Sequence, residues 1–159
     1  MKFKVTLIAL LLAVTAVQAQ KKIAGNYGYK TECMGVEGDG SETVKAWGNG
    51  RNRSDAVEQA KKNAVRDIIF FGLVEGKQEC KQKPLLLEVN AQEKYEDYFN
   101  KFFADGGEFK NYISLRDERI LDKLDRDRKR GRGSVTNGLI LRVLRSELKA
   151  KLIADGIIK

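Results

Sequence analysis

The chain has 159 residues and a formal net charge of +8, with two cysteines and no histidine. Histidine is the commonest general base and the commonest transition-metal ligand. Without it, no serine or cysteine nucleophile has its usual activating partner. We therefore expect a protein that is not an enzyme, with no catalytic residues, no metal site and no cofactor.

The first nineteen residues have the pattern of a secretory signal peptide. Lys2 and Lys4 give a basic start, and residues 5–14 are apolar but too short to cross a membrane comfortably. Val17 and Ala19 are the small residues that precede a cut after Ala19. The alternative is an uncleaved membrane anchor. With no cysteine near the cut, we expect a periplasmic or secreted protein without a lipid anchor.

Residues 20–159 then form a single domain, large enough to bury a core. Loss of Lys2 and Lys4 removes two positive charges and leaves the domain basic. For an exported basic protein, we expect an envelope protein partner or an anionic polymer or lipid surface, and no nucleic acid. The alternative is that the charge only keeps the protein soluble.

Cys33 and Cys80 are the right number of cysteines for one disulfide bond in an oxidising compartment. Closing a loop of this length stabilises a fold by about 4 kcal/mol through chain entropy. The alternative is a pair of independent buried thiols.

The alternation of residues predicts strands over 27–36 and 43–47, joined by a turn over 37–41. Gly48-Asn49-Gly50 is expected to end the second strand. A long amphipathic helix follows, with Ser54 as its N-cap and its end near Phe71. Its apolar stripe begins with small residues that let a helix lie close to a sheet: Ala56, Ala60, Ala64 and Ile68.

A second helix is expected to open at Asn90, with Glu93 completing a capping-box pattern. It carries an aromatic stripe that is typical of a core, and Asp105-Gly106-Gly107 ends it. Residues 109–115 and 135–143 alternate as two strands of a long hairpin, and residues 146–155 form a last helix. The fold class is therefore α+β, with a small antiparallel sheet of about four strands packed against a long amphipathic helix and two further helices.

The glycine turn before the long helix is a candidate for weak anion binding. Gly48 and Gly50 would offer backbone N–H groups at the helix N-terminus, and Arg51 and Arg53 would add positive charge. A dinucleotide-binding fingerprint needs a third glycine, and Arg53 stands in its place. The alternative is a plain tight turn.

The tip of the long hairpin is the second candidate, as an electrostatic docking site for an acidic partner or a membrane surface. Its basic residues are Arg126, Arg128, Lys129, Arg130 and Arg132. The alternative is a solvated loop. A third candidate, a carboxylate pair such as Glu93 and Asp97, would suit a small hydrolase, but this spacing is common on charged helices.

The segment G-N-G-R-N-R-S-D-A-V-E-Q-A-K-K-N-A resembles a signature of small exported bacterial α+β modules. These include the N-terminal domain of the flagellar assembly protein T and related envelope lipoproteins. The matching positions are Gly48, Gly50, Ala56, Ala60, Asn63 and Ala64. The resemblance implies a helix packed on a small antiparallel sheet and a non-catalytic role in envelope assembly. Unlike the lipoprotein members, this chain lacks a lipid-bearing cysteine.

Together these patterns predict an exported, non-catalytic binding or assembly module of the bacterial cell envelope. Two alternatives stay open, an electrostatic binder of anionic envelope polymer or lipid and a small carboxylate-based hydrolase.

Overall fold

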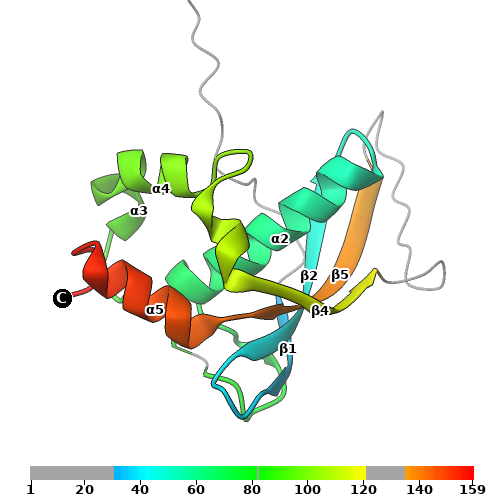
Figure 1. Ribbon diagram of the computed structural model, residues 1–159, viewed down its shortest axis with the longest axis horizontal. Helices are drawn as coiled ribbons and strands as arrows, with labels where there is room; N and C mark the ends of the chain where they lie inside the picture. The colour runs from blue at the N-terminus through cyan, green and yellow to red at the C-terminus, as the bar shows by residue number, and fades with distance from the viewer. Residues whose placement is uncertain (1–30, 82, 121–134) are drawn as a thin grey trace, which may run out of the picture.

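The computed structural model describes residues 31–81, 83–120 and 135–159, with residues 115–120 described by their backbone alone. The predicted signal peptide and the basic hairpin tip, Arg126 to Arg132, lie outside the described residues. The elements follow in the order β1 (Glu32–Val36), β2 (Glu42–Gly50), α2 (Arg53–Phe70), β3 (Glu75–Gly76), α3 (Ala91–Lys94), α4 (Glu96–Phe102), the 3-10 helix η1 (Glu108–Tyr112), β4 (Ile113–Ile120), β5 (Val135–Val143) and α5 (Arg145–Ala154) (Figure 1).

The α+β class is confirmed, with one difference in the sheet. The strand order is β3-β1-β2-β5-β4, and every neighbouring pair is antiparallel except β1 and β3, which run parallel. The sheet therefore has five strands and is mixed, where about four antiparallel strands were expected. The extra strand is the two-residue β3, which is too short to leave a periodic pattern in the sequence.

The central strand β2 is buried on one face by α2. Glu42, Val44 and Ala46 are fully buried on that face, while Lys45 and Trp47 on the other face are half-buried. Val44 pairs with Leu141 and Ala46 with Leu139 on β5, so the apolar side chains of both strands lie together under the helix. Figure 1 shows α2 lying across β2 and β5.

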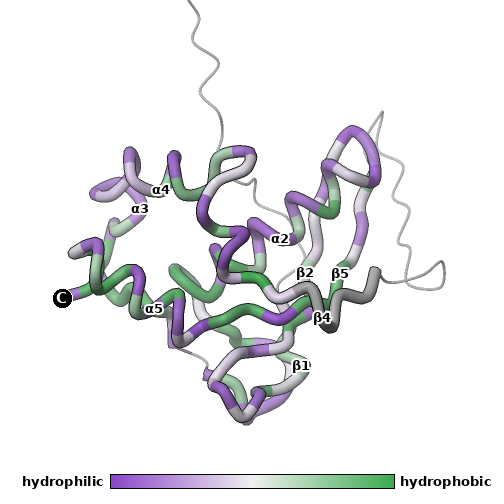
Figure 2. Tube along the Cα trace, in the orientation of Figure 1, coloured by the Kyte–Doolittle hydropathy of each residue, from purple (hydrophilic) through white to green (hydrophobic). Residues whose placement is uncertain are grey.

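Gly48-Asn49-Gly50 does not break the strand, which corrects the sequence-based expectation. All three residues belong to β2, and Gly48 pairs with Asn137 of β5. A Cβ atom added at Gly48 would lie 2.1 Å from the carbonyl oxygen of Ala56, so the helix backbone rests directly on the strand. These glycines are needed for close packing, and the chain turns only after Gly50, through a hydrophilic connection (Figure 2).

The N-cap of α2 is Asn52, two residues earlier than the predicted Ser54. The Asn52 side chain accepts a hydrogen bond from the Asp55 backbone N–H at 2.9 Å. Both residue types cap helices well, so the sequence pattern did not distinguish them. At the other end the helix stops at Phe70, as expected, and Gly72 follows with a φ of 73°.

The predicted aromatic helix is divided into α3 and α4 at Tyr95, whose ψ of 30° is not helical. Asn90 precedes α3 in the left-handed region, with no side-chain cap hydrogen bond, so the expected capping box is absent. Phe109 lies in η1 rather than in a strand, and β4 begins at Ile113. The antiparallel pairing of β4 with β5 is confirmed.

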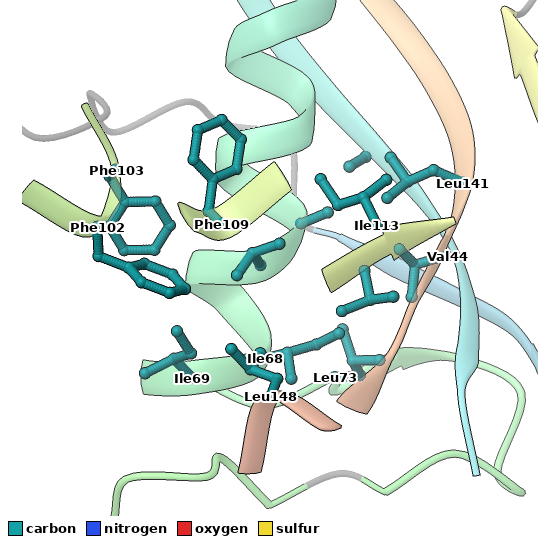
Figure 3. Packing of buried hydrophobic residues seen from close by; sticks show 14 of the residues in the cluster. Val44, Ile68, Ile69, Leu73, Phe102, Phe103, Phe109, Ile113, Leu141 and Leu148 are labelled. Atoms are coloured by element: carbon teal, nitrogen blue, oxygen red, sulfur yellow. The ribbon is translucent and has the colours of Figure 1, made fainter. Parts of the chain in front are cut away.

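The aromatic stripe belongs to the core, as predicted. Phe99, Phe102 and Phe103 are buried, and the rings of Phe103 and Phe109 lie 5.9 Å apart. Figure 3 shows Phe102, Phe103 and Phe109 gathered at one side of the core, with Val44 and Leu141 of the sheet at the other. Leu148 and Leu152 of α5 are fully buried and complete this core from the C-terminal end of the chain.

Candidate functional site

The disulfide bond expected between Cys33 and Cys80 is present, with their Cα atoms 6.3 Å apart. It joins β1 to the segment that follows β3. Both cysteines are buried, Cys33 with 1% of its surface exposed and Cys80 with 5%. The bond is compatible with an oxidising compartment and therefore with export.

We call residues 75–81 and 83–84 the strap, because this segment crosses the edge of the sheet. It begins as β3, which pairs with Glu32 and Cys33 of β1. The Lys77 N–H then donates to the Cys33 carbonyl oxygen at 3.0 Å. Gly76 has a φ of 103°, and a Cβ atom there would lie 2.2 Å from the Cys33 carbonyl oxygen, so the strap can approach β1 only through a glycine.

A buried ion pair lies between the strap, β2 and α5. The Arg145 guanidinium contacts the Glu42 carboxylate at 3.3 Å, with 7% and 0% of their side-chain surfaces exposed. The strap supplies the remaining hydrogen bonds: the Lys81 N–H donates to Glu42 at 3.0 Å, and Arg145 donates to the Lys83 carbonyl oxygen at 2.5 Å. Buried charges need such pairing to offset their lost hydration.

No sequence pattern predicted this ion pair as a whole, although the sequence carries a signal for Glu42. Glu42 has the same alternation as Val44 and Ala46, so it lies on the buried face of a strand, where an acid requires a partner. Arg145 is 103 residues away along the chain, and no local pattern identifies it as that partner.

The N-terminal end of α2, where weak anion binding was predicted, borders an open polar depression with a volume of about 460 Å³. Gly48 and Gly50 pack against the α2 backbone, so they do not form an open surface beside this depression. Arg51 is 93% exposed and lies 3.4 Å from Asp55, and Arg53 is exposed. Anion binding by Arg51 and Arg53 stays a prediction.

The charges around this depression are paired with one another. Lys62 contacts Asp105 at 2.9 Å, and Lys110 contacts Glu58 at 2.7 Å. Glu93 and Asp97, the carboxylates weighed for hydrolysis, border a second, shallower depression of about 340 Å³ on the outside of α3 and α4, where both are exposed.

Four large apolar side chains are exposed where α2 ends and the chain passes through the strap. We call them the apolar patch; their exposed fractions are 57% for Phe71, 71% for Val74, 73% for Leu87 and 85% for Val89. Two hydrogen bonds hold the segment before Leu87 against the end of α2, from Leu85 N–H to Ile68 and from Leu86 N–H to Ile69. The segments that carry these four side chains therefore adjoin each other at the end of α2.

A polar cluster joins α4 to the end of α5. The Tyr98 hydroxyl donates to Asp155 at 2.6 Å, and Lys151 contacts the same carboxylate at 3.1 Å. These two partners hold the pKa of Asp155 below its usual range, and burial together with the Asp155 charge raises the pKa of Tyr98.

No family model, curated protein or solved structure matches this chain. The resemblance to exported envelope modules thus rests on the residues quoted for it. Within residues 31–81, 83–120 and 135–159, no group of three or more acidic or cysteine side chains has the arrangement of a metal site. In the same part of the chain, no helix combines the length and apolar character needed to cross a membrane.

Proposed function

We propose that the protein is an exported, non-catalytic binding or assembly module of the bacterial cell envelope, and that it docks a protein partner through the apolar patch. The observation that carries this proposal is the exposure of four large apolar side chains on adjoining segments. Isolated exposed apolar residues are ordinary, whereas gathered ones mark interaction surfaces. The disulfide bond supports the export part of the proposal.

The character of the described depressions favours a protein over a small molecule as the partner. Ligand sites are concave and apolar with a few polar groups, whereas the two depressions described above are open and bordered by charged side chains. Exposed charges of both signs neighbour the patch residues along the chain, including Glu75, Lys77 and Glu88. Exposed apolar side chains beside charged ones are a common composition of a protein interface.

The test is photo-crosslinking in cells that export the full chain, with a photoreactive side chain at Val89 in the patch and, as a control, at Ile153, which is 48% exposed on α5. We expect one defined crosslinked protein from the patch position. The amount of complex recovered on purification should then fall by about tenfold or more in the Phe71→Ser/Leu87→Ser variant. An equal crosslinking pattern from both positions would count against docking through the patch.

The alternative of an electrostatic binder is favoured by the net charge of +8 and by the basic tip from Arg126 to Arg132. It predicts retention on vesicles containing anionic lipid, weakened by salt and by neutralising Arg128, Lys129 and Arg130. Patch variants would leave that retention unchanged, so the two proposals give opposite results with the same proteins.

A further inference from the structure

Most of the strap is exposed to solvent. From Glu75 to Glu79 every residue is exposed, as are Lys81 and Lys83, and Cys80 is its one fully buried residue. Segments with few buried apolar contacts open locally at low free-energy cost. Apart from the disulfide bond, the described attachments of the strap are the short β3 ladder and a few hydrogen bonds.

Both ends of the strap are anchored independently of that bond. Leu73, just before it, is 1% exposed, and Leu86, just after it, is 6% exposed and hydrogen-bonded through its N–H to Ile69. The strap can therefore move away from β1 as a loop between two fixed points, without breaking the backbone pairing of β2 with β5 or the hydrogen bonds from Leu85 and Leu86 to α2.

We propose that the Cys33–Cys80 disulfide is a redox-sensitive latch that couples the strap to the buried Glu42–Arg145 pair. Lys81 directly follows Cys80, and its N–H is one of the hydrogen-bond donors to Glu42. Lys83 supplies the carbonyl oxygen that accepts from Arg145. When the disulfide is reduced, the strap moves away from β1. The ion pair then loses both of its backbone hydrogen-bond partners, and water reaches the two buried charges.

The chemistry is thiol–disulfide exchange with a dithiol reductant. A thiolate of the reductant attacks the sulfur of Cys80, the more exposed of the two cysteines, and Cys33 leaves as a thiolate that takes up a proton. The second thiol of the reductant then attacks the mixed disulfide and releases Cys80 as a thiol. The protein gains two electrons and two protons, and the reductant leaves as its own disulfide.

The first test is hydrogen exchange followed by mass spectrometry on the full chain, oxidised and after treatment with dithiothreitol. We expect protection of the Lys77 and Lys81 amides to fall by about tenfold or more on reduction, while amides within α2 keep their protection. Unchanged protection at Lys81 would refute the latch. An equal loss in the strap and in α2 would refute local opening, since it would mean that the whole domain unfolds.

The second test asks whether the ion pair is coupled to the bond. Reduction should lower the thermal midpoint of the natural protein more than that of a Glu42→Gln/Arg145→Met variant, in which no charge is left without partners. Equal shifts would overturn the coupling. A Cys33→Ser/Cys80→Ser variant is the reagent control, and dithiothreitol should change neither its exchange nor its midpoint. If the charge-free variant does not fold, the exchange experiment on the natural protein still decides the proposal.

Discussion

Gly48 and Gly50 have no room for a side chain, because the backbone of α2 lies directly above them. The nearest atoms to an added Cβ at Gly48 belong to the backbone of Ala56 and Ala60. At Gly50 they are the Ala56 nitrogen and the Cβ and carbonyl carbon of Asp55. Backbone atoms of a helix cannot move aside as the end of a flexible side chain does. The two positions thus fix the distance between helix and strand.

We predict that Gly48→Ala destabilises the fold by about 3 kcal/mol, because α2 must shift to accept one methyl group. The measurement is urea unfolding followed by circular dichroism. Gly38→Ala is the matched control, since a Cβ there meets nothing within 4 Å. Equal stability of the two variants would mean that α2 does not rest on the strand.

The stripe of α2 that faces the sheet changes in size along the helix. Ala56, Ala60 and Ala64 are fully buried in its first part, and Ile68 and Ile69 are fully buried near its end. The strand below is complementary, with glycines under the alanines at one end and Val44 at the other. Helix and strand are therefore close at the N-terminal end of α2 and further apart at its C-terminal end.

The substitution Ala60→Leu tests whether the helix and the strand are close together at the alanines. We expect a loss of about 1–3 kcal/mol from overpacking, seen as a lower thermal midpoint. Lys61→Leu places the same side chain on the neighbouring, half-buried position and is the control. An unchanged midpoint for Ala60→Leu would contradict the close approach at the alanines.

The contact between α4 and α5 depends on pH through Asp155. Its pKa is lowered, first by the Tyr98 hydroxyl and then by Lys151. A lowered pKa stabilises the fold above the unfolded-state value of about 3.9, and this contribution is lost as the pH falls through the folded-state value.

Tyr98→Phe should therefore destabilise by about 1 kcal/mol at pH 7, with a difference from the natural protein that narrows below about pH 4. The measurement is urea unfolding across this pH range. In an Asp155→Asn background the effect of Tyr98→Phe should not vary with pH. A difference that stays constant in the natural background would show that Asp155 is not the titrating partner.

Local periodicity accounts for the parts of the fold that the sequence predicted. The alternation of β2 and β5, the stripe of α2 and the aromatic core positions of α4 are all present. The glycines of β2 indicate a turn when only the sequence is considered, because glycine is common both in turns and under a closely packed helix. The parallel β3 and the Glu42–Arg145 pair depend on distant segments meeting, which no short window contains.

In the molecule as a whole, the Glu42–Arg145 pair joins three segments that are far apart in sequence: the centre of the sheet, the strap and the last helix. Arg145 begins α5, and no side chain caps this helix start. A cation is unfavourable at the positive end of a helix dipole. Glu42 offsets that cost, so the start of α5 is held in place by tertiary contacts.

We predict that Arg145→Met destabilises the protein by about 3–5 kcal/mol, because it leaves Glu42 buried without its cation. Adding Glu42→Gln should recover much of this loss, since the remaining groups are neutral. Chemical unfolding of both single variants and the double variant gives the coupling directly. A double variant as unstable as the sum of the two single variants would mean that the residues act independently.

The pairing of β2 with β5 also determines when the domain can be completed. β2 has one neighbour, β1, that is nearby in sequence, whereas Ala46 pairs with Leu139 and Gly48 with Asn137. Because the chain is synthesised from its N-terminus, one edge of β2 stays unpaired until the residues after 134 have been made. Contacts of such sequence separation slow folding and leave strand edges exposed meanwhile. During synthesis, this protein therefore depends on β5, near the end of the chain, to cover the edge of β2.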